Sequence, residues 1–195
     1  MNRTSLARTV PPSELPVSVA EAKEHLRVTH STDDDMIERH IEAATDLVER
    51  ECGRVLVSQT WAMKLDGFPR ACGVRGRYIE LPKVPGRSVT SIAYVDLNGT
   101  AQTLATDQYT VHADDWQPFV SEAYGVSWPS TRLQPDAVTV TFVAGYASAA
   151  AVPSALKQAV LLHVQASYDN LQASEAQGLN ASIRRLIAPY RVPVI

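Results

Sequence analysis

The sequence has few of the residues that build metal centres and none of the common catalytic motifs. Its two cysteines, Cys52 and Cys72, are too few for a zinc site, which takes four ligands, usually in closely spaced pairs. The five histidines are scattered without an H-x-x-x-H or H-E-x-x-H pattern. The sequence also lacks G-x-S-x-G, a P-loop and G-x-G-x-x-G. We therefore expect reduced structural thiols, no cofactor and no enzyme activity.

Long apolar runs are missing as well. No stretch approaches the roughly 20 apolar residues that a membrane-spanning helix needs. The N-terminal MNRTSLARTVPPSELP has two arginines but lacks the apolar core of a secretory signal. Apolar residues make up 45% of the chain and charged residues 20%, which is a globular balance and not a disordered one. We expect a soluble protein made in the cytoplasm, with no membrane partner.

Charge is separated along the chain. Residues 31–53 carry eight acids and two bases, whereas residues 180–195 carry Arg184, Arg185 and Arg191 and no acid. Duplex DNA binding needs clustered cations, and the most amphipathic stretch of this chain is acidic. The separation favours docking between protein surfaces over general nucleic-acid binding.

Two helices are predicted near the N-terminus. SVAE at 18–21 has the form of a capping box and predicts a helix over about 19–27. Thr32 is the expected cap of a second helix over about 32–52, which Gly53 ends. Its first turn holds three aspartates, 33–35, which the helix dipole favours there. Consecutive helical residues point about 100° apart, so these carboxylates converge poorly on a metal ion.

The rhythm changes after Arg54. Six short segments rich in β-branched and aromatic residues, separated by turn residues, predict an antiparallel β unit over 54–147. Asn98-Gly99 is a strong hairpin signal, because these residues tolerate the positive φ of a primed turn. The segments are VLVSQTWAMKLDGFP, RYIELP, SVTSIAYVD, TAQTLA, QYTVHA and AVTVTFVAGY.

Helical patterning returns over about 153–171 and 181–188. We therefore predict an α+β fold, in which a helical bundle formed by 16–53 and 152–188 carries the β unit as an insertion. Residues 1–15 form a lead before the bundle. Residues 189–195 form a C-terminal tail.

Blocks spread over residues 16–192 carry a family resemblance. In order they are PVSVAEAKEHLRV, IEAATDLVERECGRVLVSQTWAMKLDGFP, IELPKVPGRSVTSIAYVDLNGTAQTL, YGVSWPSTRLQPDAVTVTFVAGY, VPSALKQAVLLHVQASYDN and LIAPYRV. Together they resemble the head–tail connector (adaptor) proteins of tailed phages, the group called gp6-like or phiE125 gp8-like. Prophages and gene transfer agents carry the same proteins.

The resemblance implies a structural role in a virion or phage-like particle, assembled in the bacterial cytoplasm. Such adaptors form a ring, expected to be twelve-fold, between the portal and the stopper or tail proteins, and DNA passes non-specifically through the central channel. An alternative within the same particle is a stopper or tail-completion ring protein. An enzyme acting on nucleic acid or cell wall is a third class, and no catalytic cluster supports it.

The C-terminal sequence LIAPYRVPVI fits the docking segment that the resemblance implies. In such connectors this segment docks on the portal and becomes ordered as it binds. The expected portal-docking residues here are Arg184, Arg185, Leu186, Ile187, Tyr190, Arg191, Val192 and Ile195. Pro189 and Pro193 hold the tail partly extended, so that less entropy is lost on docking. Alternatively, Leu186 and Ile187 close the core of the protein itself.

The second helix carries acids at helical spacing. Glu38, Glu42, Asp46 and Glu49 share one face. The resemblance implies that they line the channel, where negative charge avoids binding to phosphates, or that they meet arginines of a neighbouring subunit. An ordinary solvated face is the remaining interpretation.

Overall fold

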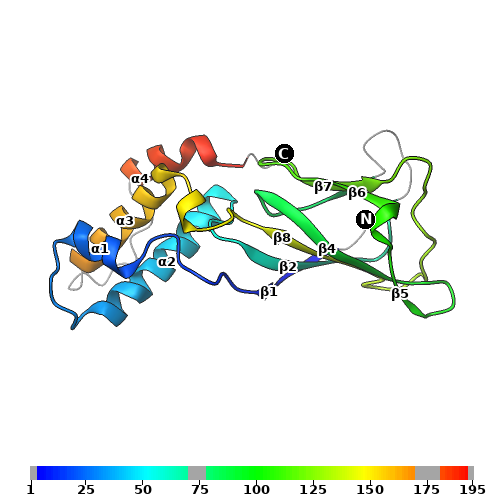
Figure 1. Ribbon diagram of the computed structural model, residues 1–195, viewed down its shortest axis with the longest axis horizontal. Coiled ribbons are helices and arrows are strands. Elements are labelled where there is room, and N and C mark those ends of the chain that lie inside the picture. The colour runs from blue at the N-terminus through cyan, green and yellow to red at the C-terminus, as the bar shows by residue number, and fades with distance from the viewer. Residues whose placement is uncertain (1–3, 70–77, 170–180, 193–195) are drawn as a thin grey trace. The chain divides into compact units, whose positions relative to one another are not determined.

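The chain divides into two compact units, each containing two separate stretches of sequence. A computed structural model describes residues 4–69, 78–169 and 181–192. Met1–Pro11 and Ser58–Gly145 form the β unit, and Pro12–Val57 and Tyr146–Ile195 form the helical unit (Figure 1). The predicted α+β fold, a helical bundle with an antiparallel β insertion, is confirmed.

The helical unit contains the four predicted helices at nearly the predicted positions. They are α1 (Val19–Leu26), α2 (Asp34–Cys52), α3 (Ser154–Asp169) and α4 (Ala181–Ile187), with short 3-10 turns at η3 (Ala149–Ala151) and η4 (Ala188–Tyr190). The predicted end of the third helix, at 171, lies outside the described residues. Helix α3 packs on both α2 and α4, and α1 packs on α2 and α3.

Local sequence determines where α1 and α2 begin and end. The capping box is present: the Ser18 hydroxyl accepts from the Glu21 amide, and the Glu21 carboxylate accepts from the Ser18 amide. These bonds hold the pKa of Glu21 below its usual value. The prediction of Thr32 as cap of α2 was wrong, because the N-cap is Asp33. Gly53 ends α2 in the left-handed conformation (φ 68°), as expected from its lack of a Cβ.

Helical periodicity places the apolar stripe of α2 in one core with α3 and α4. Burial of such a stripe is the main source of helix stability in a folded protein. The fully buried side chains of this core include Ile37, Ile41, Val48, Leu56, Leu156, Val160, Val164, Ile183 and Ile187. Leu56 comes from the segment just after α2, so the chain remains in the helical unit for four residues beyond Gly53.

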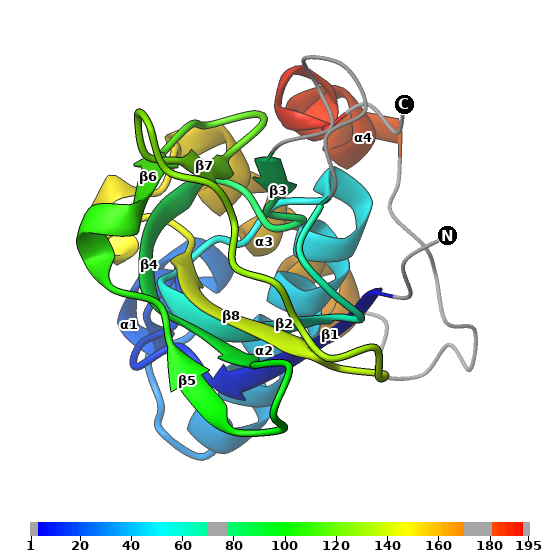
Figure 2. The ribbon, with the colours of Figure 1, turned by 90° about the vertical axis from the view of Figure 1, so that its right-hand side faces the viewer.

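The β unit is built from two antiparallel sheets. A five-stranded sheet has the order β1 (Thr4–Val10), β2 (Gln59–Leu65), β8 (Val138–Ala144), β4 (Gly86–Val95), β5 (Ala101–Thr103). A three-stranded sheet has the order β3 (Tyr78–Glu80), β7 (Phe119–Glu122), β6 (Tyr109–His112). The short turn η2 (Thr106–Gln108) precedes β6. The smaller sheet lies above one face of the larger (Figures 1 and 2).

The core of the β unit follows the two-residue period of its strands. Along β8, Val138, Val140, Phe142 and Ala144 are buried and the residues between them are half-buried. Ile79, Ile92 and Val120 complete this core from other strands, and Phe68 stacks on Trp128 with ring centroids 4.9 Å apart. Each of the six predicted strand segments contains a strand.

Two strands were not predicted. Residues 4–10, placed in the N-terminal lead, form β1, which pairs with β2 from Thr4 opposite Leu65 to Val10 opposite Thr60. This strand is an edge strand with mostly exposed side chains, so no apolar alternation marks it in the sequence. The other is β7, which has only four residues.

The predicted hairpin at Asn98-Gly99 joins β4 to β5, but its turn is not of the primed type. Only Gly99 has a positive φ (86°), whereas a type I′ turn requires positive φ at two successive residues. The Gly99 amide donates to the Asp96 carbonyl, and the Asp96 carboxylate accepts from the amides of Asn98 and Thr100. These bonds hold the pKa of Asp96 below its usual value. The side chain of Asp96 therefore organises the turn.

Candidate interaction surfaces

Helix α4 and the turn after it close the helical unit on one side. Ile183 and Ile187 lie one helical turn apart and are 1% and 2% exposed, so this face of α4 is part of the core. Tyr190 is half-buried against the same core, and Leu186 is half-buried. Pro189 ends the regular helix, because it lacks an amide hydrogen and restricts the residue before it.

Residues 190–192 are tied to the end of α2. The Val192 amide donates to the Cys52 carbonyl (2.9 Å), and the Arg191 Nε donates to the Glu51 carbonyl (3.2 Å). These are carbonyls of the last turn of α2, which have no partner inside their own helix. Arg54, which is 3% exposed, donates from its Nε to the Tyr190 carbonyl (2.7 Å). We call residues 190–192 the C-terminal strap.

The predicted portal-docking residues fall into distinct environments. Ile187 is buried; Leu186, Tyr190 and Val192 are half-buried; Arg184, Arg185 and Arg191 are exposed; and Ile195 lies outside the described residues. The structure thus places Ile187 in the core of its own unit, which was the alternative interpretation of this segment. It brings the three arginines to the surface on and next to α4.

A pocket of about 230 Å³ lies between the end of α2 and the α4–η4 segment. Its lining residues are Glu51, Arg184, Ile187, Ala188 and Arg191. Within the described residues, neither Arg184, Arg185 nor Arg191 lies within 4 Å of a carboxylate oxygen. The pocket therefore combines an apolar floor with two guanidinium groups, a donor arrangement that matches carboxylates.

The acidic face of α2 is only partly available for contacts. Glu38, Glu42 and Asp46 are exposed. Glu49 is half-buried, and its Oε1 accepts a 2.7 Å hydrogen bond from the Leu56 amide. This bond supports the chain where it turns back after Gly53. The spacing of the acids in the sequence does not distinguish Glu49 from the others, because the turn that engages it is a tertiary feature.

Two substitutions of Glu49 separate the effect of losing this hydrogen bond from the effect of losing the negative charge. Glu49→Gln retains an oxygen acceptor and should change the free energy of unfolding by less than about 0.5 kcal/mol. Glu49→Ala leaves the Leu56 amide without its partner and should cost about 1–2 kcal/mol. Urea denaturation followed by circular dichroism measures both. Equal stability of the two variants would contradict the role assigned to this bond.

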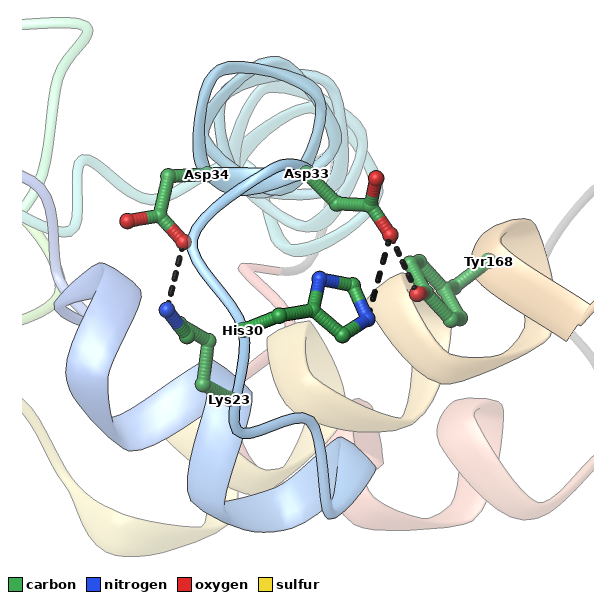
Figure 3. A network of polar contacts seen from close by, with 5 residues as sticks. All are labelled: Lys23, His30, Asp33, Asp34 and Tyr168. Atoms are coloured by element: carbon green, nitrogen blue, oxygen red, sulfur yellow. Dashed lines mark hydrogen bonds and ion pairs between the residues drawn. The ribbon is translucent and has the colours of Figure 1, made fainter.

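The start of α2 carries a polar network that involves three helices (Figure 3). Asp33 accepts a 2.7 Å hydrogen bond from the Tyr168 hydroxyl of α3, and the His30 Nε2 lies 3.9 Å from the same oxygen. Asp34 pairs with Lys23 of α1 at 2.6 Å. The bond to Asp33 raises the pKa of Tyr168. Two of the three aspartates therefore hold neighbouring elements in place.

Burial shifts the pKa values of Cys52, His40 and His163 in the helical unit. Burial raises the pKa of the Cys52 thiol to about 11, so it is protonated at neutral pH and a poor nucleophile. Burial also lowers the pKa of His40 and of His163. Among the described residues, no group of three histidines, cysteines or acids could hold a metal ion, and no helix is long and apolar enough to cross a membrane. Cys72 lies outside these ranges.

Reasoning from sequence missed Arg54 and the exposed apolar residues of the β unit. Arg54 is the only charged residue in GRVLV, a stretch that otherwise reads as buried, and this isolation was the available signal. Leu133 is 94% exposed, and Leu97, Trp116 and Tyr124 are also exposed, all of them in loops. Periodicity is a property of helices and strands and says nothing about burial in loops.

Comparison with known proteins shows similarity to a head-tail connector family and to chains of gene transfer agent particles. Residues 16–95 match the family model of the phage gp6-like head-tail connector protein. A chain in the neck of an empty gene transfer agent particle, determined with C6 symmetry, aligns with a TM-score of 0.80 and 24% identity, over 98% of this chain and 97% of that one. Among curated proteins, none matches this sequence.

A second solved structure gives the same result. A chain in the neck of a native gene transfer agent particle, determined with C12 symmetry, aligns with a TM-score of 0.73 and 26% identity, over 99% of this chain and 97% of that one. The family match covers α1, α2 and strands β2 to β4, and the structural match covers both units. The resemblance seen in the sequence is thereby confirmed: residues 16–95 are similar to the phage gp6-like head-tail connector family, and the chain has the fold of a chain from the neck of a gene transfer agent particle.

Proposed function

We propose that this protein is a structural head–tail adaptor of a phage-like particle, forming a ring between the portal and the stopper or tail proteins. The observation that carries the proposal is the match of nearly the whole chain to neck chains of a gene transfer agent particle. DNA passes through the centre of the ring without sequence-specific contacts. The proposal assigns the protein no reaction and no cofactor, and its location is the neck of the particle.

The portal contact is assigned to the C-terminal segment. Because Ile187 is buried in its own unit, the proposal rests on the residues beyond α4, namely Tyr190, Arg191, Val192 and Ile195. Three hydrogen bonds already tie the strap to the end of α2 and to Arg54 in the isolated chain. We infer that the segment docks from a largely preformed position, which reduces the entropy lost on binding.

Two truncations test the portal contact, with the portal protein from the same locus as partner. A chain ending at Val192 keeps the strap bonds and loses only 193–195; a chain ending at Ala188 loses the strap as well. We expect the full chain to form rings on the portal, the first truncation to bind more weakly, and the second to fail. Electron microscopy and co-sedimentation measure the outcome, and circular dichroism shows whether each truncation folds.

Other outcomes redirect the proposal. Equal binding by all three chains would leave the adaptor role standing and remove the segment from the contact. Failure of the full chain to bind the portal, combined with binding to a preformed portal–adaptor complex, would favour a stopper or tail-completion protein.

A further inference from the structure

We infer that the cationic pocket beside α4 receives acidic side chains from α2 of a second copy of this chain. This contact rests on the proposed ring and specifies how neighbouring subunits meet. The acidic residues are Glu38, Glu42 and Asp46, and the receiving residues are Arg184, Arg191 and the adjacent Arg185.

Ring symmetry requires two different surfaces on each chain. In a closed ring of identical subunits with more than two members, each contact is head-to-tail: one surface of a chain meets a different surface of the next. These two surfaces have to be complementary to each other. Among the described elements of the helical unit, the face of α4 and the acidic face of α2 form such a pair by charge.

The receiving surface is a pocket whose arginines have no ion-pair partner among the described residues. Arg184 and Arg191 line the pocket with Ile187 and Ala188, and within the described residues no acid forms an ion pair with either guanidinium. Glu51 also lines the pocket and offsets part of this charge, while the exposed Arg185 adds to it. The net local charge is therefore positive. A carboxylate matches the planar donor fork of a guanidinium group and can bind it through two hydrogen bonds.

The donating side is an exposed ridge. Glu38, Glu42 and Asp46 recur every fourth residue, which places their Cα atoms along a line of about 12 Å on the helix surface. Arg39 and Arg50 are also exposed on α2 and lie toward one side of the ridge. Glu49 does not contribute, since its carboxylate holds the Leu56 amide.

The two surfaces of one chain do not neutralise each other. The last residues of α2 lie against the strap, through the bond between Cys52 and Val192. The helix extends from there away from α4, so that its acidic first half lies on the other side of the helical unit (Figures 1 and 2). Two such surfaces on different sides of one subunit suit a chain that is flanked by a neighbour on each side.

Complementary charge reversal tests this contact with the full chain. The first variant is Glu38→Lys/Glu42→Lys/Asp46→Lys; the second is Arg184→Glu/Arg185→Glu, which spares Arg191 and its strap bond. Like charges across the contact should weaken self-association of each variant about 10- to 100-fold, because they repel each other and leave charged groups unpaired. A matched control, Arg87→Glu/Arg132→Glu, reverses two exposed arginines of the β unit and should assemble like the wild type.

Mixing the two variants gives the decisive result. Each reversed surface then meets a reversed partner on the other variant, so an equimolar mixture should regain assembly as an alternating ring, which closes only with an even number of subunits. Analytical ultracentrifugation at low salt measures self-association, and co-sedimentation measures binding to the portal ring. Assembly of either single variant at the wild-type level, or failure of the mixture to recover, would overturn the contact.

Separate readouts distinguish this inference from the proposed function. If the charge-reversed variants bind the portal as well as the wild type does, the lateral contact is overturned and the adaptor role stands. Charge-dependent self-association without portal binding would support the contact and count against the adaptor role. Arginine variants that associate normally but lose binding to acidic portal residues or to DNA would instead identify those as the occupants of the pocket, and would overturn the inference.

Discussion

Replacing Ile187 by alanine is expected to lower the free energy of unfolding of the free protein by about 2–4 kcal/mol. The side chain is 2% exposed and packs in the core with α2 and α3, so its removal leaves a cavity in addition to the lost burial. If Ile187 were instead an anchor kept for the portal, truncation would weaken docking and leave the free protein unchanged. Stability of the isolated chain therefore distinguishes the two interpretations.

The distribution of tryptophan allows the two units to be followed separately. Trp61, Trp116 and Trp128 all belong to the β unit, whereas the α-helices belong to the other. Urea denaturation of Ile187→Ala should shift the far-ultraviolet circular dichroism transition, which reports mainly the helices, more than the fluorescence transition. Arg185→Ala on the exposed side of the same helix is the control and should stay within about 0.5 kcal/mol. An unchanged circular dichroism transition in Ile187→Ala would refute its placement in the core.

Replacing Arg54 by methionine should release the C-terminal strap and destabilise the helical unit by about 1.5–3 kcal/mol. Arg54 is 3% exposed and donates a charged hydrogen bond to the Tyr190 carbonyl. Methionine has a similar length and fills much of the same space, but it cannot donate. The Tyr190 carbonyl then loses its partner, and the neighbouring bond from Val192 to Cys52 loses support.

Hydrogen exchange gives the local readout for this variant. The Val192 amide should exchange faster in Arg54→Met than in the wild type, because its protection depends on the strap remaining closed. Arg50→Met, at an exposed position near the end of α2, is the matched control and should leave both stability and exchange nearly unchanged. Retained protection of Val192 in Arg54→Met would show that the strap is held by its other contacts alone.

The Ile187 and Arg54 variants together test whether the C-terminal segment contributes to the stability of the free protein. A docking segment that becomes ordered only on binding would add little stability to the free chain. The structure indicates that the segment, as far as Val192, does stabilise the free chain. It satisfies carbonyls of α2 and covers part of the core. Under the proposed function, the portal would meet a prearranged surface formed by the strap.

Sequence alone determined the features that depend on local pattern. The 3.6-residue stripe of α2, the Ser18–Glu21 capping box and the left-handed stop at Gly53 could be read directly, because each involves residues that are neighbours in the chain. The same holds for the six strand segments and for the helix–β–helix order. The family resemblance, carried by ordered blocks along the chain, suggested the neck-protein fold before any geometry was known.

Only the tertiary structure decided which of the equivalent residues are free to bind. Glu49 looks like Glu42 in sequence, but the turn after α2 engages its carboxylate, and Ile187 looks like any apolar anchor until α2 and α3 cover it. β1 is a strand because β2 lies beside it, and its own residues do not alternate. These outcomes depend on contacts between residues far apart in the chain, whose hydrogen bonds and burial form only when distant segments meet, and no local pattern encodes them.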